Sequence, residues 1–338
     1  MNDVPPQPVR FEPLLVPKPW GGRRLESLLG RRLPPGVLVG ESWEIADLPS
    51  GRTRVADGPL AGQTPGNLVQ RWGVDLLGPA ISPHQPFPLL VKFLDARENL
   101  SIQAHPKPRD APDATASEKH ECWYILHADP DAQLYIGLRD GVGPGDVARA
   151  MGSRALVELM RTWSPRPGQC YFLPSGTLHA LGTGVVVAEI QTPCDVTYRA
   201  YDWERVDADG RRRELHPREA LENTRYDVRP EDVLLATPVR SVALGQATRL
   251  VACPAFDVFR WEAPRAAGLP IHRGLLRAWI ILHGPLHIDH PLCSRPLERG
   301  QVWLLPAAFG DCVVDAPAGG AWIEARAPGR ASPAADPT

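Results

Sequence analysis

The chain has 338 residues and a mass of 37.0 kDa, enough to bury a sizeable core in two domains or in one large domain with an accessory. Its 37 basic and 39 acidic side chains give a formal net charge of -2, which argues against a nucleic-acid or membrane-surface partner. The six cysteines are scattered singly, and no stretch has the pattern of a signal peptide or the length of a membrane span, so we expect a soluble cytoplasmic protein with reduced thiols.

Short apolar runs rich in Val, Leu, Ile, Trp and Tyr, separated by many of the 38 prolines and 30 glycines, predict a mainly β fold. The predicted strands cover residues 86–96, 121–128, 132–138, 168–176, 184–192, 277–284 and 300–308. Helical spacing occurs in three segments, 64–78, 145–163 and 216–224. In the second of these, a single stripe can hold Val147, Met151, Leu156, Leu159 and Met160.

Two stretches of the chain resemble each other. Residues 166–176 read RPGQCYFLPSG and residues 298–308 read ERGQVWLLPAA, so that a glycine turn, a short strand and a proline recur. This repeat predicts two related β domains in tandem, covering 1–240 and, in a smaller form, 241–326. The tail, 327–338, is rich in Pro and Ala and is predicted to be disordered.

Four side chains have the spacing of a metal site. Gln103 and His105 lie two residues apart on a predicted strand, so they point to one face. Glu121 opens the next apolar run, and His179 closes the motif P-x-G-x-x-H. Two imidazoles and a carboxylate form the ligand set of an open catalytic metal site, and an amide oxygen can supply a fourth ligand.

The order of these elements resembles the metal-binding pattern of the cupin family of jelly-roll barrels. The resemblance implies two cupin-type jelly-roll β-barrels in tandem with a few helical inserts. The second repeat has PAAFGDC where the first has PSGTLHA, and no glutamate follows His283, His287 and His290 at strand spacing. We therefore expect these three to be loop and edge-strand histidines, and the second barrel to be structural and free of metal.

Longer blocks resemble one family more closely. PLLVKFLDARENLSIQAHP, EKHECWYIL, FLPSGTLHALGTG and AEIQTPCDVTYRAYDWERVDADGRRRELHP are similar to the signature blocks of type I mannose-6-phosphate isomerases, especially their short bacterial form. KPWGGRRL and GESWEIAD also fit. The resemblance extends from about residue 10 to 225 and is loose beyond. HPKPRD and EIQTPCD depart from the family pattern, which leaves fine substrate preference open.

The resemblance implies a zinc-dependent aldose–ketose isomerase that interconverts mannose 6-phosphate and fructose 6-phosphate through a cis-enediol. It implies one zinc ion per chain and a sugar-phosphate substrate as the partner. The implied zinc ligands are Gln103, His105, Glu121 and His179. We expect a monomer or weak homo-oligomer, with no nucleic-acid or membrane partner.

Isomerisation moves a proton between C1 and C2, so the site must stabilise negative charge that develops on the sugar oxygens. Arg199, the family's active-site arginine by resemblance, offers a planar fork of donors that suits the enediolate oxygens or the phosphate. Lys119 lies two residues before Glu121 and can serve as the base, and Glu189 can serve as the proton shuttle or as a hydrogen-bond partner. The sequence leaves the choice open.

The phosphate needs its own anchor. Ser101 shares a strand face with Gln103, and the resemblance implies that Lys92 binds phosphate; a structural ion pair of Lys92 with Asp95 or Glu98 is the alternative. Trp20 is expected at the cavity mouth, with core packing as its alternative.

Two other functions remain open. An iron-dependent cupin dioxygenase uses two histidines and a carboxylate as well, although the Gln ligand and the phosphate-type cations argue against it. A non-catalytic sugar-phosphate-binding cupin needs no complete metal set beside an arginine.

Overall fold

The computed structural model describes residues 4–107, 118–207, 209–234, 237–242 and 245–327. They form two compact units, each drawn from separate segments of the chain. Unit 1 comprises 1–14, 44–90 and 236–338, and unit 2 comprises 15–43 and 91–235. The predicted domain division at residue 240 stays a prediction, and the predicted disordered tail lies outside the described residues except for Ala327.

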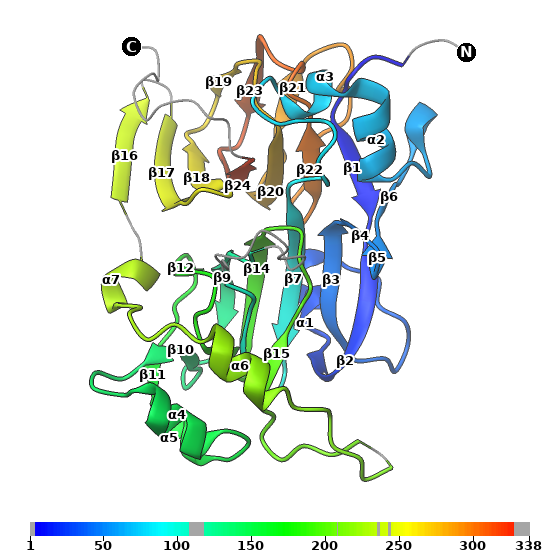
Figure 1. Ribbon diagram of the computed structural model, residues 1–338. Helices are drawn as coiled ribbons and strands as arrows, with labels where there is room; N and C mark the ends of the chain where they lie inside the picture. The colour runs from blue at the N-terminus through cyan, green and yellow to red at the C-terminus, as the bar shows by residue number, and fades with distance from the viewer. Residues whose placement is uncertain (1–3, 108–117, 208, 235–236, 243–244, 328–338) are drawn as a thin grey trace. The chain divides into compact units, whose positions relative to one another are not determined.

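Unit 2 contains two sheets (Figure 1). The larger has six strands in the order β12 (Cys170–Leu173), β9 (Glu121–Ala128), β14 (Val185–Gln191), β7 (Leu90–Ala96), β2 (Leu14–Gly22) and β3 (Val39–Ile45). The smaller has five, in the order β11 (Met160–Trp163), β10 (Leu134–Leu138), β13 (His179–Leu181), β8 (Ile102–Ala104) and β15 (Tyr198–Tyr201). β9 pairs antiparallel with β12 and β14, and β8 pairs antiparallel with β13 and β15.

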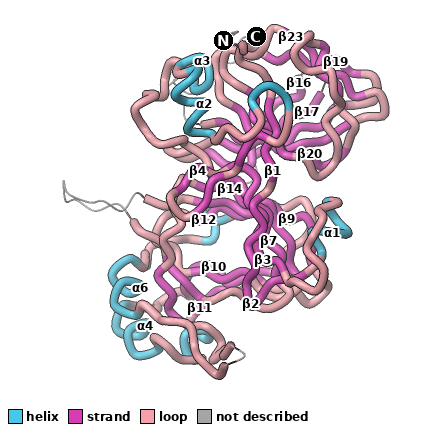
Figure 2. Tube along the Cα trace, turned by 90° about the vertical axis from the view of Figure 1, so that its right-hand side faces the viewer, coloured by secondary structure: helices cyan, strands magenta, loops and turns pink. Residues whose placement is uncertain are grey.

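The two faces of the five-stranded sheet differ. Leu134, Ile136 and Leu181 join a core cluster that also contains side chains of the six-stranded sheet, such as Trp123 and Val187. On the opposite face the strands pack against helices α4 (Pro144–Ala150), α5 (Ala155–Glu158) and α6 (Pro217–Asn223). Figure 2 shows α4 and α6 side by side next to β10 and β11. Two further helices of the unit are α1 (Arg24–Leu29) and α7 (Pro230–Val233).

Side-chain alternation places the polar residues of this sheet. Ile102 and Ala104 pack against the helical layer, so Gln103 between them points to the other face. His179 and Arg199 are the Cα partners of Gln103 on the two neighbouring strands, and directly opposed residues of an antiparallel pair share a face. Three of the predicted site residues therefore lie side by side on the inner face of the sheet.

The prediction of one helix over 145–163 is wrong. Two short helices, α4 and α5, cover only part of the segment, and Met160 begins strand β11. Met151 leaves the helical conformation with ψ 138°, and Gly152 has φ 72°, in the left-handed region that favours glycine. The apolar stripe is partly retained, since Leu156 and Met160 are buried in the same cluster, but two different elements supply it.

Unit 1 contains an eight-stranded sheet, a three-stranded sheet and a two-stranded ribbon. The eight-stranded order is β16 (Thr237–Val242), β17 (Gly245–Ala252), β18 (Asp257–Ala263), β24 (Gly320–Arg326), β20 (Arg277–His283), β22 (Val302–Leu305), β1 (Val9–Glu12) and β6 (Arg54–Val55). The three-stranded order is β19 (Ala267–Ile271), β23 (Cys312–Ala316) and β21 (His287–Asp289), and the ribbon joins β4 (Asp47–Leu48) to β5 (Gly51–Arg52). The helices are η1 (Gly58–Leu60), α2 (Pro65–Trp72) and α3 (Val74–Leu77).

The internal repeat is visible in the sheet order of both units. In unit 2 the neighbours β12, β9 and β14 belong to the larger sheet, and β13 belongs to the smaller one. In unit 1 β22, β20 and β24 are neighbours in the larger sheet, and β23 belongs to the smaller one. The structure confirms the prediction of a mainly β fold with a few helical inserts. Within the described ranges, none of the helices has the length and apolar character needed to cross a membrane.

Candidate metal centre

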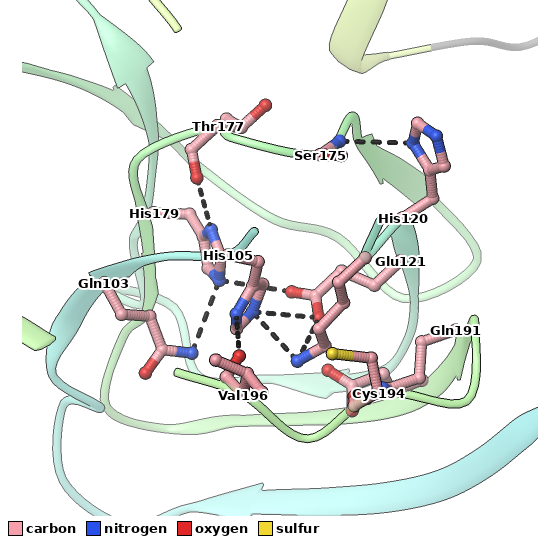
Figure 3. A network of polar contacts seen from close by, with 12 residues as sticks. Gln103, His105, His120, Glu121, Ser175, Thr177, His179, Gln191, Cys194 and Val196 are labelled. Carbon is pink, nitrogen blue, oxygen red and sulfur yellow. Dashed lines mark hydrogen bonds and ion pairs between the residues drawn. The ribbon is translucent and has the colours of Figure 1, made fainter. Parts of the chain in front are cut away.

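His105, Glu121 and His179 come together in the interior of unit 2 (Figure 3). His105 follows β8, Glu121 is the first residue of β9, and His179 is the first residue of β13. All three are buried, and one ligand atom from each lies within 4.8 Å of the others. Glu121 Oε2 is 3.3 Å from His105 Nε2, and Glu121 Oε1 is 3.2 Å from His179 Nε2. Three residues that are far apart in the sequence thus form one compact cluster.

Hydrogen bonds behind the two imidazoles orient their Nε2 atoms toward the carboxylate. His105 Nδ1 lies 2.9 Å from Val196 O, and His179 Nδ1 lies 2.8 Å from Thr177 O. A carbonyl only accepts, so each Nδ1 carries the donated proton and each Nε2 presents a lone pair. Backbone partners of this kind are typical of metal-ligating histidines.

The protonation states are those of metal ligands. Burial, followed by the charge of Lys119, lowers the pKa of His105 to about 3, so this imidazole is neutral at neutral pH. Burial alone would raise the pKa of Glu121, but Lys119 and the two histidines outweigh it and hold the pKa well below its usual range. Both Glu121 oxygens are buried, and the polar groups that face them are the two imidazoles and the Lys119 ammonium. A buried anionic carboxylate between two imidazoles whose Nε2 atoms face it fits a divalent cation such as zinc.

Gln103 lies beside this cluster. Its Nε2 is 3.4 Å from His179 Nε2, and its Oε1 accepts a hydrogen bond of 3.1 Å from Ser101 Oγ. The predicted fourth ligand and the predicted substrate residue Ser101 therefore contact each other at the edge of the cluster.

Lys119 contacts two of the three clustered residues. Its Nζ lies 2.9 Å from His105 Nε2 and 3.1 Å from Glu121 Oε2, and the side chain is buried. Lys119 precedes the first residue of β9 by two positions, and its ammonium group lies beside the cluster.

A cavity of about 130 Å³ adjoins the cluster in unit 2. Its wall is formed by Lys18, Trp20, Glu41, Trp43, Lys92, Leu94, Leu100, Ser101, Gln103, Lys119, Trp123, Glu189, Asp195, Thr197, Arg199 and Arg213. Five of these side chains are cationic and three are carboxylates, a formal excess of two positive charges (5 − 3). Such a wall suits an anionic ligand with polar groups.

Lys92 is buried in this wall with two carboxylates close by. Its Nζ lies 3.5 Å from Glu41 Oε2 and 3.6 Å from Glu189 Oε2, so the ion-pair partners suggested by the sequence, Asp95 and Glu98, are wrong. Burial alone would lower the pKa of Lys92, but Glu41 and Glu189 outweigh it and raise the pKa. The lysine is thus a permanently charged member of the wall.

Glu189 faces the same cavity from β14. Its Oε1 accepts a hydrogen bond of 3.0 Å from Trp123 Nε1. Burial and then the negative charge of Glu121 raise the pKa of Glu189, against the opposing effect of Lys92. A carboxyl group with a raised pKa can exchange a proton at a pH where an ordinary glutamate is fully ionised.

Arg199 reaches the cavity from β15. Its Nη1 donates to Glu214 O at 2.7 Å, whereas its Nε is buried without a partner among the described residues. Backbone contacts with His216 fix the strand at this point, since Arg199 N donates to His216 Nδ1 at 3.1 Å. The guanidinium therefore lines the cavity and keeps one buried donor, Nε, that no described residue accepts from.

Some wall residues were missed by the sequence reasoning. Glu41 precedes Trp43 by two residues on β3, so strand alternation could have identified it as a neighbour of the cavity. Arg213, which pairs with the buried carboxylate of Asp202, is one of three consecutive arginines, and no local signal distinguishes it from the other two. Trp20, predicted at the cavity mouth, is buried and forms part of the wall.

The three histidines of unit 1 lie elsewhere. His283 ends β20, and His287 begins β21, an edge strand of the three-stranded sheet. His290 packs its ring against Phe309. Among the described residues, none of the three belongs to a cluster that could hold a metal ion.

Comparisons with known proteins agree with this geometry. The family described as "Phosphomannose isomerase type I, catalytic domain" matches residues 10–128. The probable mannose-6-phosphate isomerase GmuF of Bacillus subtilis (strain 168) is 32% identical over 313 residues, covering 91% of this chain and 96% of that protein. The crystal structure of the mannose 6-phosphate isomerase from Bacillus subtilis has a TM-score of 0.82 at 29% identity, covering 94% of this chain and 99% of that one. A zinc-bound mannose 6-phosphate isomerase, at 16% identity and a TM-score of 0.73 over 95% and 99% of the two chains, shares the fold.

Proposed function

Because the chain belongs to the type I phosphomannose isomerase family, we propose that it interconverts mannose 6-phosphate and fructose 6-phosphate with one zinc ion. Membership of the family is the premise, and the proposal concerns the reaction, its metal and its mechanism. One observation carries it. The buried group of His105, Glu121 and His179 lies beside a cationic cavity, whose wall residues Gln103 and Lys119 contact that group.

His105, Glu121 and His179 would hold the zinc ion, with Gln103 as a fourth ligand. A bound zinc ion supplies positive charge that stabilises the negative charge developing on the sugar oxygens. For Gln103 to serve as a ligand its amide must turn so that the oxygen faces His179, and its NH₂ group then donates to Ser101 Oγ. Both orientations keep the contact with Ser101.

Proton transfer between C1 and C2 is the central step, and Glu189 is suited to it. Its raised pKa and its position in the wall support a carboxylate that takes the proton from one carbon and returns it to the other. Lys119 is placed to donate a hydrogen bond to a sugar oxygen near the ligands, and the free Nε of Arg199 to stabilise the enediolate.

The phosphate requires cations that line the cavity. Lys92 and Ser101 remain the proposed anchors, although Lys92 is already balanced by two carboxylates. The other cations of the wall are Lys18, which pairs with Glu41, Arg213, which pairs with Asp202, and Lys119 and Arg199. Trp20 offers an apolar surface for the sugar ring.

A coupled assay on mannose 6-phosphate, with and without a chelator, tests the proposal when it is combined with metal analysis of the purified protein. We expect turnover with one zinc ion per chain and loss of turnover after chelation, restored by added zinc. Turnover should continue without oxygen, which excludes the dioxygenase reading. A protein that holds zinc and binds the sugar phosphate without converting it would instead favour the non-catalytic reading.

A further inference from the structure

The two histidines of the metal centre depend on different parts of the chain for their orientation. His179 donates to the carbonyl of Thr177, two residues earlier in its own segment. His105 donates to the carbonyl of Val196, which is 91 residues away in the sequence. The position of Val196 therefore decides which way the His105 ring faces, and an element outside the ligand strands must hold it.

Val196 belongs to the loop of residues 192–197, between β14 and β15. Asp195 and Thr197 of this loop line the cavity. The first residue, Thr192, is tied to the strand that carries the metal ligand, since its Oγ1 accepts from His120 N at 3.2 Å. This anchors only the start of the loop, and the turn that leads to Val196 requires another support.

Gln191 provides that support. It is the last residue of β14, fully buried, and it lies directly across from Glu121 on β9, so its side chain shares the face of the metal cluster. Its Nε2 donates to Thr192 O at 3.0 Å and also to Cys194 O, which braces the turn from the inside. Its Oε1 is buried with no partner among the described residues.

The unpartnered Oε1 indicates why an amide side chain occupies this position. An apolar side chain of the same shape would avoid burying an unsatisfied acceptor, so packing alone does not account for an amide here. The two N–H donors are the part of the side chain that the fold uses.

We propose that Gln191 is a positioning residue of the isomerase: through the loop of residues 192–197 it fixes the carbonyl of Val196, which sets the tautomer and orientation of His105. This inference rests on the proposed metal centre. Ligand-orienting partners of this kind affect metal affinity more than fold, because they fix the direction of a lone pair.

The test replaces Gln191 with methionine, which has a similar length but no donor. We expect zinc affinity, measured by competition with a chelator, to fall by about 10- to 100-fold. The absorption bands of the Co²⁺-substituted protein should shift, because the geometry at His105 changes. At saturating zinc we expect kcat to fall more than KM rises, since the ligand geometry is disturbed more than the cations of the wall.

A matched control is Ile190→Val. Ile190 is the buried neighbour on the same strand, points to the opposite face, and has no part in the loop. It should lose packing but keep the zinc affinity and the cobalt spectrum of the parent protein. If Gln191→Met does not fold, Gln191→Asn is the second test variant. It keeps the amide, but its side chain is one methylene too short to reach Cys194 O. We expect it to show the same losses of zinc affinity and kcat.

The outcomes separate the two proposals. Parent-like zinc affinity and an unchanged cobalt spectrum in a folded Gln191→Met or Gln191→Asn variant would overturn the role of Gln191 and leave the metal centre intact. Failure of the parent protein itself to bind zinc would overturn the proposed function instead. A change of equal size in Ile190→Val would show that Gln191 acts only through stability.

Discussion

The three residues proposed as ligands have no substitute nearby, because no other histidine or acidic residue in the described ranges joins the group. We predict that His105→Ala, Glu121→Ala and His179→Ala each lose zinc and activity together. The loss of affinity should exceed the roughly 10- to 100-fold typical of removing a hydrogen-bond partner behind a ligand. Gln103→Ala should be milder, because a neutral amide contributes less than a carboxylate.

Metal analysis of the purified variants checks this prediction. His127→Ala is a suitable control, because His127 also lies on β9 but pairs with Asp129 outside the cluster. Full zinc occupancy in all three alanine variants of the ligands would contradict the site assignment.

The kinetics of a variant at Arg199 can distinguish a role in catalysis from a role in ground-state binding of the substrate. Arg199→Lys keeps the positive charge but loses the planar fork of donors with which the side chain lines the cavity. If the guanidinium stabilises charge that appears only in the transition state, kcat should fall by roughly 10²-fold or more with zinc content unchanged. A rise in KM with kcat preserved would assign Arg199 to the ground-state phosphate, and unchanged kinetics would remove it from the site.

At the scale of elements, the predicted strands in both units exist, because alternating or continuous apolar runs bounded by Gly and Pro are a strong local signal. The prediction of one helix over 145–163 was wrong because the left-handed conformation of Gly152 depends on tertiary contacts. Its N–H donates to Ala200 O of β15 at 3.0 Å, a strand more than 40 residues away. The apolar stripe alone does not encode that bond.

Gly152 also gives a prediction for stability. Gly152→Ala should destabilise the protein by roughly 1–2 kcal/mol, since φ is positive there and the added Cβ meets only Leu215 Cδ1 at an ordinary 3.6 Å. Gly145→Ala is the matched control inside helix α4, where φ is negative. It should be neutral or stabilising by about 0.5–1 kcal/mol. Urea unfolding of both variants checks the difference, and equal effects would contradict it.

The candidate site, like the helix, could be predicted from the sequence only in part. The ligand residues are recognisable because their chemistry and order are unusual, and strand alternation places them on one face. The carbonyl of Val196 and the ion pairs of Lys92 could not be predicted, because they depend on how strands far apart in the sequence are brought into register.

At the scale of the whole molecule, the repeat explains why unit 1 should hold no metal. Glu121 is the register partner of Leu173, and at the equivalent position of the repeat Arg277 is the register partner of Leu305. The buried guanidinium of Arg277 lies 3.8 Å from Glu324 and donates to two backbone carbonyls. A fixed cation thus stands where unit 2 has its carboxylate ligand.

We predict that Arg277→Met destabilises the protein by about 2–3 kcal/mol, because it removes charge-assisted hydrogen bonds and part of the compensation of the buried Glu324. Zinc content should stay at one ion per chain. Denaturant unfolding and metal analysis measure the two effects. A change in zinc stoichiometry would show that unit 1 takes part in metal binding after all.

The pairing of β1 with β22 has a consequence for synthesis of the protein. β1 ends at Glu12 and its partner begins at Val302, whereas the last residue of unit 2 is Leu235. At roughly 5–20 residues per second, a ribosome needs about 15–60 s to make the partner strand after β1 emerges. Throughout that time β1 has an unpaired edge, whereas all strands of unit 2 are synthesised before β22 is made. Unit 2 can therefore complete its sheets while β1, the earliest strand of unit 1, still waits for β22.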